Sequence, residues 1–138
     1  MWSGGGVSPL VDVGVRNVIF DLGGVLLDWN PDKILQSFDV LLYGLSDMPV
    51  SIYTHVRLRH DFWKLFRGIV ISGEVKMMKP EPEVFKYLLA RFGLEPGQTV
   101  FVDDFPLNID AARAVGLRAI QFCDAAQCER DLNELLAA

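Results

Sequence analysis

The sequence predicts an α/β fold in which helices cover both faces of a mostly parallel β-sheet. Short apolar segments alternate with segments whose apolar residues recur at helical spacing, and only short connections separate them. This alternation is typical of parallel sheets with right-handed crossovers. Polar residues directly follow three of the apolar segments, at the edge where such sheets bind ligands. We therefore expect a three-layer sandwich with a site at the carboxyl edge of its sheet.

Five strands are predicted from apolar runs bounded by turn residues. The first is followed by Asp21, and the second by Ser46 and Asp47. The fourth is followed by Asp103 and Asp104. The five predicted strands span residues 15–20, 40–45, 68–72, 99–102 and 119–122.

Five helices are predicted between and after these strands. A proline begins each of the first three, and Gly93 and Gly116 end the third and fourth. Asp124 is the expected N-cap of the last helix. The five predicted helices span residues 31–38, 49–59, 82–92, 107–115 and 125–136.

Length and composition fit one globular domain. The 138 residues are 51% hydrophobic and 22% charged, which provides ample apolar material for a core. We expect a loose N-terminal tail at residues 1–14 and a core domain at 15–138. The formal net charge of −5 and the lack of a basic stripe argue against nucleic acid as a partner.

The sequence also predicts a cytoplasmic protein with no membrane partner. No apolar run reaches the roughly 18 residues of a membrane span, and the first residues lack a signal-peptide pattern. Cys123 and Cys128 form neither a disulfide framework nor a zinc-binding spacing. We therefore expect two buried free thiols in a reducing compartment.

Asp21 is the first candidate catalytic residue. It joins an apolar strand to the glycine-rich turn that contains Gly23 and Gly24. The strand fixes the carboxylate, and the flexible backbone after it lets a substrate approach closely. This arrangement is typical of a nucleophile or a metal ligand. An ordinary strand exit uses the same residue types, so this segment alone leaves both interpretations open.

Asp103 and Asp104 place two carboxylates side by side at the end of the fourth strand. Carboxylates this close repel each other unless a cation or hydrogen-bond donors hold them. Together with Asp21 they offer the hard oxygen ligands that Mg²⁺ prefers, which favours a magnesium site. We also expect one of the pair to cap the helix that follows.

Lys79 lies in a segment whose prolines, Pro80 and Pro82, restrict the backbone just before a helix. A lysine held on such a loop above several carboxylates reduces their repulsion and binds a phosphoryl group. The alternative is an ordinary exposed lysine.

These four segments, taken in order, resemble the four motifs of the haloacid dehalogenase superfamily of phosphohydrolases. The similar segments are residues 20–26, 45–47, 79–82 and 103–108. The residues of these segments are most similar to those of the subgroup that includes sugar-phosphate phosphatases and the phosphatase domain of soluble epoxide hydrolase. The resemblance covers nearly the whole chain from residue 15. It implies a Rossmann-like core with a five-stranded, mostly parallel sheet.

The resemblance implies a two-step phosphoryl transfer. Asp21 would attack phosphorus, and water would hydrolyse the aspartyl-phosphate that forms. Ser46 would hydrogen-bond a phosphoryl oxygen, and Lys79 would stabilise the shared charge. The implied phosphate-binding residues are Ser46, Asp47, Lys79, Gly23 and Gly24.

The resemblance also implies a magnesium cofactor. Asp21, the backbone carbonyl of Gly23 and Asp104 would hold Mg²⁺, and Asp103 and Asn108 would support the shell around the ion.

Two features depart from the family pattern. Gly23 stands where the family commonly has an Asp that acts as acid and then base, a role worth roughly 10²–10⁴ in rate. Only 24 residues, 22–45, separate Asp21 from Ser46, so the helical cap of the subgroup is absent or minimal. A site without a lid loses desolvation and substrate contacts. Apolar surface that a cap would cover would also favour a homodimer.

Three function classes follow from the sequence. The first is a Mg²⁺-dependent phosphohydrolase acting on small phosphorylated metabolites. The second is a 2-haloacid dehalogenase, which uses the same nucleophile without metal and is disfavoured by the retained Asp103 and Asp104. The third is a non-catalytic or barely catalytic phosphate-binding module, which fits Gly23 and the missing cap. The sequence does not name the substrate.

Overall fold

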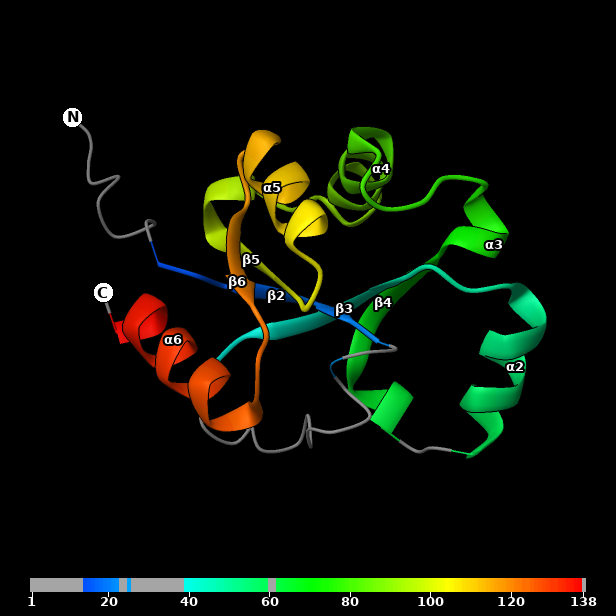
Figure 1. Cartoon of the computed structure of the whole chain (residues 1–138), viewed down its shortest axis with the longest axis horizontal. Helices are drawn as coiled ribbons and strands as arrows, with labels where there is room; N and C mark the ends of the chain where they lie inside the picture. The colour runs from blue at the N-terminus through cyan, green and yellow to red at the C-terminus, as the bar shows by residue number, and fades with distance from the viewer. Residues whose placement is uncertain (1–13, 23–24, 26–38, 60–61, 138) are drawn as a thin grey trace.

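Five parallel strands form one sheet. The computed structural model describes residues 14–22, 25, 39–59 and 62–137, and the statements below concern these residues. The strand order is β4-β3-β2-β5-β6, and every neighbouring pair is parallel (Figure 1). The strands are β2 (Asn17–Asp21), β3 (Leu41–Ser46), β4 (Phe66–Ile71), β5 (Thr99–Asp103) and β6 (Arg118–Gln121). The predicted parallel sheet is confirmed.

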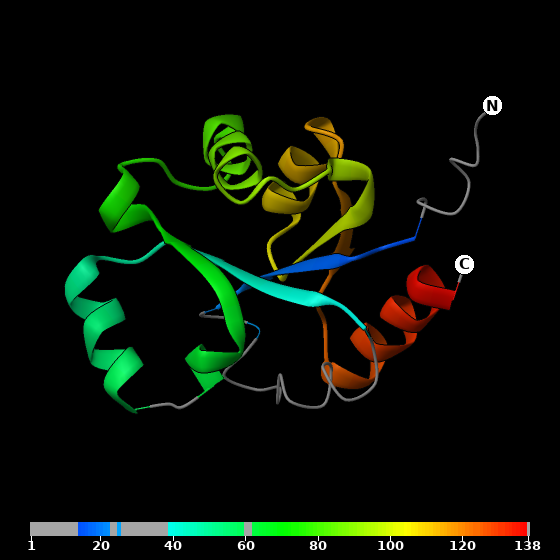
Figure 2. The same ribbon diagram turned by 180° about the vertical axis from the view of Figure 1, so that it is seen from behind.

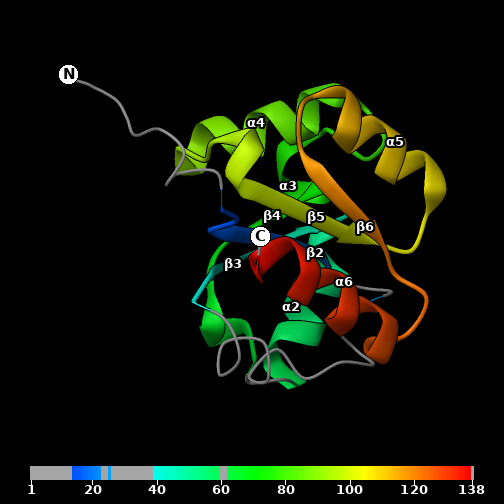
Figure 3. The ribbon, with the colours of Figure 1, turned by 90° about the vertical axis from the view of Figure 1, so that its left-hand side faces the viewer.

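Helices cover both faces of this sheet. One face carries α4 (Pro82–Phe92) and α5 (Pro106–Ala114), whereas the other carries α2 (Val50–Arg59) and α6 (Ala125–Ala137) (Figure 3). Figure 2 shows the same three layers from behind. Shorter elements are α3 (Ser72–Val75), η3 (Phe62–Leu65) and η4 (Pro96–Gln98). The predicted three-layer sandwich is therefore confirmed.

The sheet separates two apolar cores because successive side chains of a strand point to opposite faces. In β2, Val18 and Phe20 belong to the core that α6 covers, while Ile19 belongs to the core beneath α4 and α5. Phe85 of α4 meets Phe101 of β5 edge-on, with ring centroids 5.1 Å apart. Burial on both faces explains why the central strands are nearly continuous apolar runs.

The structure differs from the sequence prediction around the third strand. β4 begins at Phe66 rather than at residue 68, and Ser72 begins the helix α3 instead of ending the strand. Four residues are too few to display helical spacing, so the pattern did not reveal α3. The helix ends at Lys76, which has a left-handed backbone conformation with φ 61°.

The end of α4 and the start of α6 agree with the sequence, whereas the N-cap of α5 is Phe105 rather than the expected Asp103 or Asp104. Gly93 ends α4 with φ 65°, a conformation that glycine adopts without Cβ strain. Asp124 Oδ1 accepts a hydrogen bond from the Gln127 backbone N–H at 2.8 Å, as expected of the cap of α6. Residues 1–13 of the predicted tail and the predicted helix 31–38 lie outside the described residues.

The two cysteines have different surroundings. Cys128 is buried in α6, and burial raises the pKa of its thiol to about 12. Cys123 is exposed, so the prediction of two buried thiols was wrong for this residue. It lies beyond the end of β6, where the chain leaves the sheet. Among the described helices, none is long and apolar enough to cross a membrane.

Candidate active site

Three of the predicted site residues stand at strand ends. Asp21, Ser46 and Asp103 are the last residues of β2, β3 and β5. β2 pairs with β3 on one side and with β5 on the other, so the order in which the chain adds strands reverses between β2 and β5. Ligands of open α/β sheets bind outside the strand ends at such a switch point. The three residues share this edge.

Lys79 is buried between two of these carboxylates. Its Nζ lies 2.8 Å from Asp103 Oδ2 and 3.2 Å from Asp21 Oδ1, and its side chain is 3% exposed. The same ammonium donates to the Leu45 carbonyl at 3.4 Å. The Lys79 backbone N–H donates to Asp47 Oδ1 at 3.0 Å, which ties the loop before α4 to the end of β3. The alternative of an exposed surface lysine is therefore wrong.

Burial and charge act against each other at this ion pair. Burial disfavours the ionised carboxyl group and raises the pKa of Asp21 above its ordinary value, although Lys79 opposes the shift. For Lys79, burial favours the neutral amine, but the negative charges of Asp21 and Asp103 outweigh it and raise the pKa of the ammonium. Lys79 therefore keeps a positive charge beside Asp21 at neutral pH.

The protein engages both carboxylate oxygens of Asp103. Oδ2 accepts hydrogen bonds from Lys79 Nζ and from Asn108 Nδ2, the latter at 3.0 Å. Oδ1 accepts from the Phe105 backbone N–H at 2.9 Å, just before α5 begins. Asp103 thus positions the lysine and fixes the chain that enters α5. Its neighbour Asp104 is exposed.

The oxygens at this edge fit a hard divalent cation. Asp21, Asp103 and Asp104 each bring a carboxylate oxygen within 4.8 Å of the other two. Asn108 Oδ1 is buried and has no hydrogen-bond partner among the described residues. Such oxygen donors are the ligands that Mg²⁺ prefers. Because both Asp103 oxygens already accept hydrogen bonds, Asp21 and Asp104 are the better candidates for direct contact with a cation.

Ser46 is buried, with 2% of its surface exposed, and the Asp47 that follows is exposed. Leu45 is in register with Asp21, so Ser46 lies one position further along the neighbouring strand. Gly23 and Gly24, the other predicted phosphate-binding residues, lie outside the described residues.

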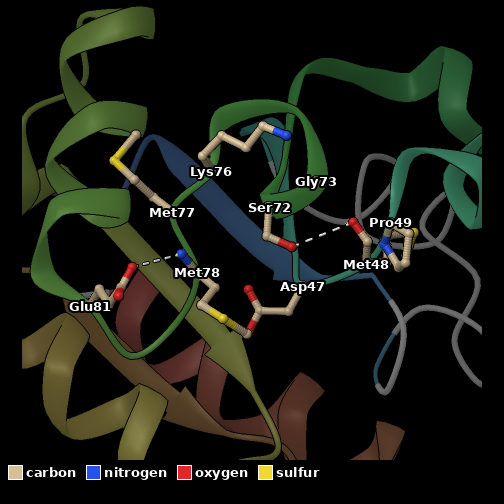
Figure 4. A pocket seen from close by; sticks show the side chains of 9 residues that line it. All are labelled: Asp47, Met48, Pro49, Ser72, Gly73, Lys76, Met77, Met78 and Glu81. Carbon is tan, nitrogen blue, oxygen red and sulfur yellow. Dashed lines mark hydrogen bonds between the residues drawn. The ribbon is translucent and has the colours of Figure 1, made fainter.

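A pocket of about 600 Å³ adjoins this edge, between the segment after β3, the helix α3 and the loop before α4 (Figure 4). Gly73 permits the close approach of α3, because a Cβ there would lie 2.8 Å from the Met48 carbonyl oxygen. Among the residues that line this pocket, Asp47 is the one that the sequence indicated as a candidate site residue. A usable signal was present, since Ser72 and Gly73 directly follow the apolar strand β4. The pocket is lined by Asp47, Met48, Pro49, Ser72, Gly73, Lys76, Met77, Met78 and Glu81.

Comparison with known proteins identifies relatives of the chain. Residues 53–122 match the family model of haloacid dehalogenase-like hydrolases. The sesquiterpene phosphatase astK of Aspergillus oryzae is 30% identical over 102 residues, which cover 74% of this chain and 52% of that protein. The fructose-1-phosphate phosphatase YqaB of Escherichia coli is 36% identical over 75 residues, which cover 54% of this chain and 38% of that protein. The chain spans about half or less of the length of these relatives.

A solved structure shares the fold. It is a crystal structure of a haloacid dehalogenase family enzyme from Bacteroides thetaiotaomicron in complex with magnesium and inorganic phosphate. The TM-score is 0.71 at 18% identity, with 81% of this chain and 96% of that chain covered. The family model itself matches just over half of the chain. The chain therefore belongs to the haloacid dehalogenase-like hydrolase family, as its four motif-like segments predicted.

Proposed function

We propose that this chain is a Mg²⁺-dependent phosphohydrolase that acts on small phosphorylated metabolites through an aspartyl-phosphate on Asp21. The observation that carries this proposal is the buried Lys79 ammonium, 3.2 Å from Asp21 Oδ1 and 2.8 Å from Asp103 Oδ2. A fixed cation reduces the repulsion between an anionic nucleophile and an anionic phosphoryl group. The relatives named as phosphatases support the same reaction class. We assign the activity to a core domain of residues 15–138.

In the first step, a carboxylate oxygen of Asp21 attacks phosphorus while the bond from phosphorus to the leaving alcohol oxygen breaks. Lys79 neutralises charge on Asp21 and on the phosphoryl group, and Ser46 donates its hydroxyl hydrogen to a phosphoryl oxygen. Asp103 holds Lys79 in place. The proposed phosphate-binding set is completed by Asp47, Gly23 and Gly24.

In the second step, water attacks the phosphorus of the aspartyl-phosphate and the bond from phosphorus to the Asp21 oxygen breaks. Inorganic phosphate leaves, and the Asp21 carboxylate is restored. The alcohol released in the first step takes its proton from water, because Gly23 has no side chain that could donate one. A positioned acid contributes roughly 10²–10⁴ in rate, and we expect slow turnover of substrates whose alcohol is a poor leaving group.

Asp21 and Asp104 would hold Mg²⁺ together with the Gly23 carbonyl, and Asp103 and Asn108 would support them. The ion, when bound, supplies positive charge that offsets the charge on the phosphoryl oxygens. The cluster of three carboxylates and the unpartnered Asn108 Oδ1 support this assignment.

The test is phosphate release from p-nitrophenyl phosphate in Mg²⁺ and in EDTA, with wild-type protein and Asp21→Asn. We expect release only with Mg²⁺, and a loss of at least ~10³-fold in the variant, which keeps the shape of the side chain but not its nucleophilic charge. Asp110→Asn is the matched control, because Asp110 is exposed on α5. It should retain full activity, and far-ultraviolet circular dichroism should show all three proteins folded.

Other results would identify the other function classes. Halide release from 2-chloropropionate that is indifferent to EDTA would support a dehalogenase. Binding of inorganic phosphate with no release from any ester would support a non-catalytic module. Equal phosphate release by Asp21→Asn and wild type would contradict the proposed nucleophile.

A further inference from the structure

The pocket of about 600 Å³ adjoins the proposed site, because the segment after β3 and the loop that carries Lys79 contribute to both. Asp47 lines the pocket, and its Oδ1 accepts the hydrogen bond from the Lys79 backbone N–H. Met78, which also lines the pocket, immediately precedes Lys79 in the chain. A group bonded to a phosphate beside Lys79 therefore has this pocket as a neighbouring space. Its volume is typical of small-molecule sites.

Four apolar residues form much of this lining: Met48, Pro49, Met77 and Met78. Methionine side chains are flexible and polarisable, so such a surface adapts to apolar groups of different shape. Met78 leaves 51% of its surface exposed, and an apolar ligand that covers it would remove this apolar area from water. Phe105 and Leu107, which follow β5 at the same edge, are 50% and 57% exposed.

The polar side chains of the lining are partly engaged by the protein itself. Ser72 Oγ donates to the Met48 carbonyl at 3.4 Å, and Glu81 Oε1 accepts from the Met78 backbone N–H at 3.0 Å (Figure 4). Asp47 is engaged by Lys79 in the same way. A sugar needs hydrogen-bond partners for each hydroxyl that it buries, whereas an alkyl chain needs only apolar contact. Lys76 is exposed, so its charge stays in water.

We propose that this pocket receives the apolar alcohol portion of the substrate, and that the substrate class is phosphate monoesters of alkyl-type alcohols rather than sugar phosphates. The inference rests on the proposed function for the position of the phosphate. The phosphate lies beside Ser46 and Lys79, and the apolar chain runs past Met78 into the space between α3 and the segment after β3.

The first test compares kcat/KM for ethyl, butyl, hexyl and octyl phosphate with that for glucose 6-phosphate, all in Mg²⁺. All are esters of primary alcohols, which are poor leaving groups, so we expect slow turnover of each and only small differences in leaving-group reactivity. We expect kcat/KM to rise with chain length, by up to about four-fold for each methylene that becomes fully buried. Octyl phosphate should exceed glucose 6-phosphate by at least ~10-fold.

Met78→Gln tests the surface directly, because glutamine has a similar size but a polar end. We expect a loss of about five-fold or more for octyl phosphate and no loss for ethyl phosphate. Leu58→Gln is the matched control, since Leu58 is 83% exposed on α2 and does not line the pocket. A rate independent of chain length, or equal effects of Met78→Gln on both esters, would overturn the inference while phosphatase activity stands.

Binding separates this inference from the proposed function. Calorimetry with octylphosphonate and ethylphosphonate, which are not hydrolysed, measures the pocket without turnover. Tighter binding of octylphosphonate that Met78→Gln removes would support the pocket even if no ester were hydrolysed. Equal binding of the two phosphonates, or no binding of either, would overturn it.

Discussion

Lys79 shows how burial gives a common residue a special role. Its ammonium is nearly inaccessible to water and contacts carboxylates from two different strands. Burial of these charges is tolerable only because they compensate one another. Since the pKa of Lys79 is raised, the favourable contribution of its charge is complete below the ordinary lysine pKa and is lost as pH rises through the higher folded-state value.

Replacing this cation should destabilise the fold. Lys79→Met leaves Asp21 and Asp103 buried without a counter-charge, and we expect the free energy of unfolding to fall by about 3 kcal/mol at neutral pH without Mg²⁺. The deficit should shrink in acid, because protonation removes the uncompensated charge. Urea unfolding at several pH values measures both effects. Lys86→Met, at an exposed lysine of α4, is the control. A deficit that is equal at all pH values would argue against a charge effect.

At the scale of the elements, the close contact between β4 and the end of α4 depends on a glycine. A Cβ on Gly68 would overlap the ring of Phe92, the last residue of α4. The same ring packs against Tyr43 of β3, with centroids 5.1 Å apart. The end of α4 therefore lies directly over the backbone of the edge strand β4. This strand leads directly into α3, whose Ser72 and Gly73 line the pocket.

Gly68→Ala should disrupt this contact. The added methyl group forces Phe92 or the strand to move, which costs roughly 1–3 kcal/mol in an overpacked core. Gly97→Ala is the matched control, because a Cβ at that position meets nothing within 4 Å. We expect the control to change stability by no more than about 0.5 kcal/mol. Thermal and urea unfolding of the two variants would show whether they differ, and equal stabilities would contradict the packing account.

At the scale of the whole molecule, the parallel strand order assembles the site from distant parts of the chain. Asp21, Ser46 and Asp103 come together only because β2 lies between β3 and β5. Lys79 comes from the loop between α3 and α4, which follows β4 in the sequence. Such an assembly exists only in the folded state, so a cation that it binds stabilises the whole fold.

Mg²⁺ should therefore raise the melting temperature in a saturable manner. At a concentration of about 100 Kd, a ligand specific to the folded state stabilises it by about 2.7 kcal/mol. Asp104→Asn should weaken this effect, because it removes the charge of an exposed carboxylate within the acidic cluster. Asp110→Asn, on an exposed face of α5, should leave the effect unchanged. A thermal shift that NaCl of equal ionic strength reproduces would contradict a specific site.

The sequence by itself determined the fold class, the alternation of the five strands with the longer described helices, and the chain positions of Asp21, Ser46, Lys79 and the aspartate pair. These follow from local information, because apolar periodicity and turn residues act within a few positions of each other. Only the tertiary structure decided that Asp103 holds Lys79, that Cys123 is exposed, and that α3 and the methionine-lined pocket exist. The physical reason is that these features depend on contacts between residues far apart in the chain, which the packing of the whole sheet sets and no local pattern records.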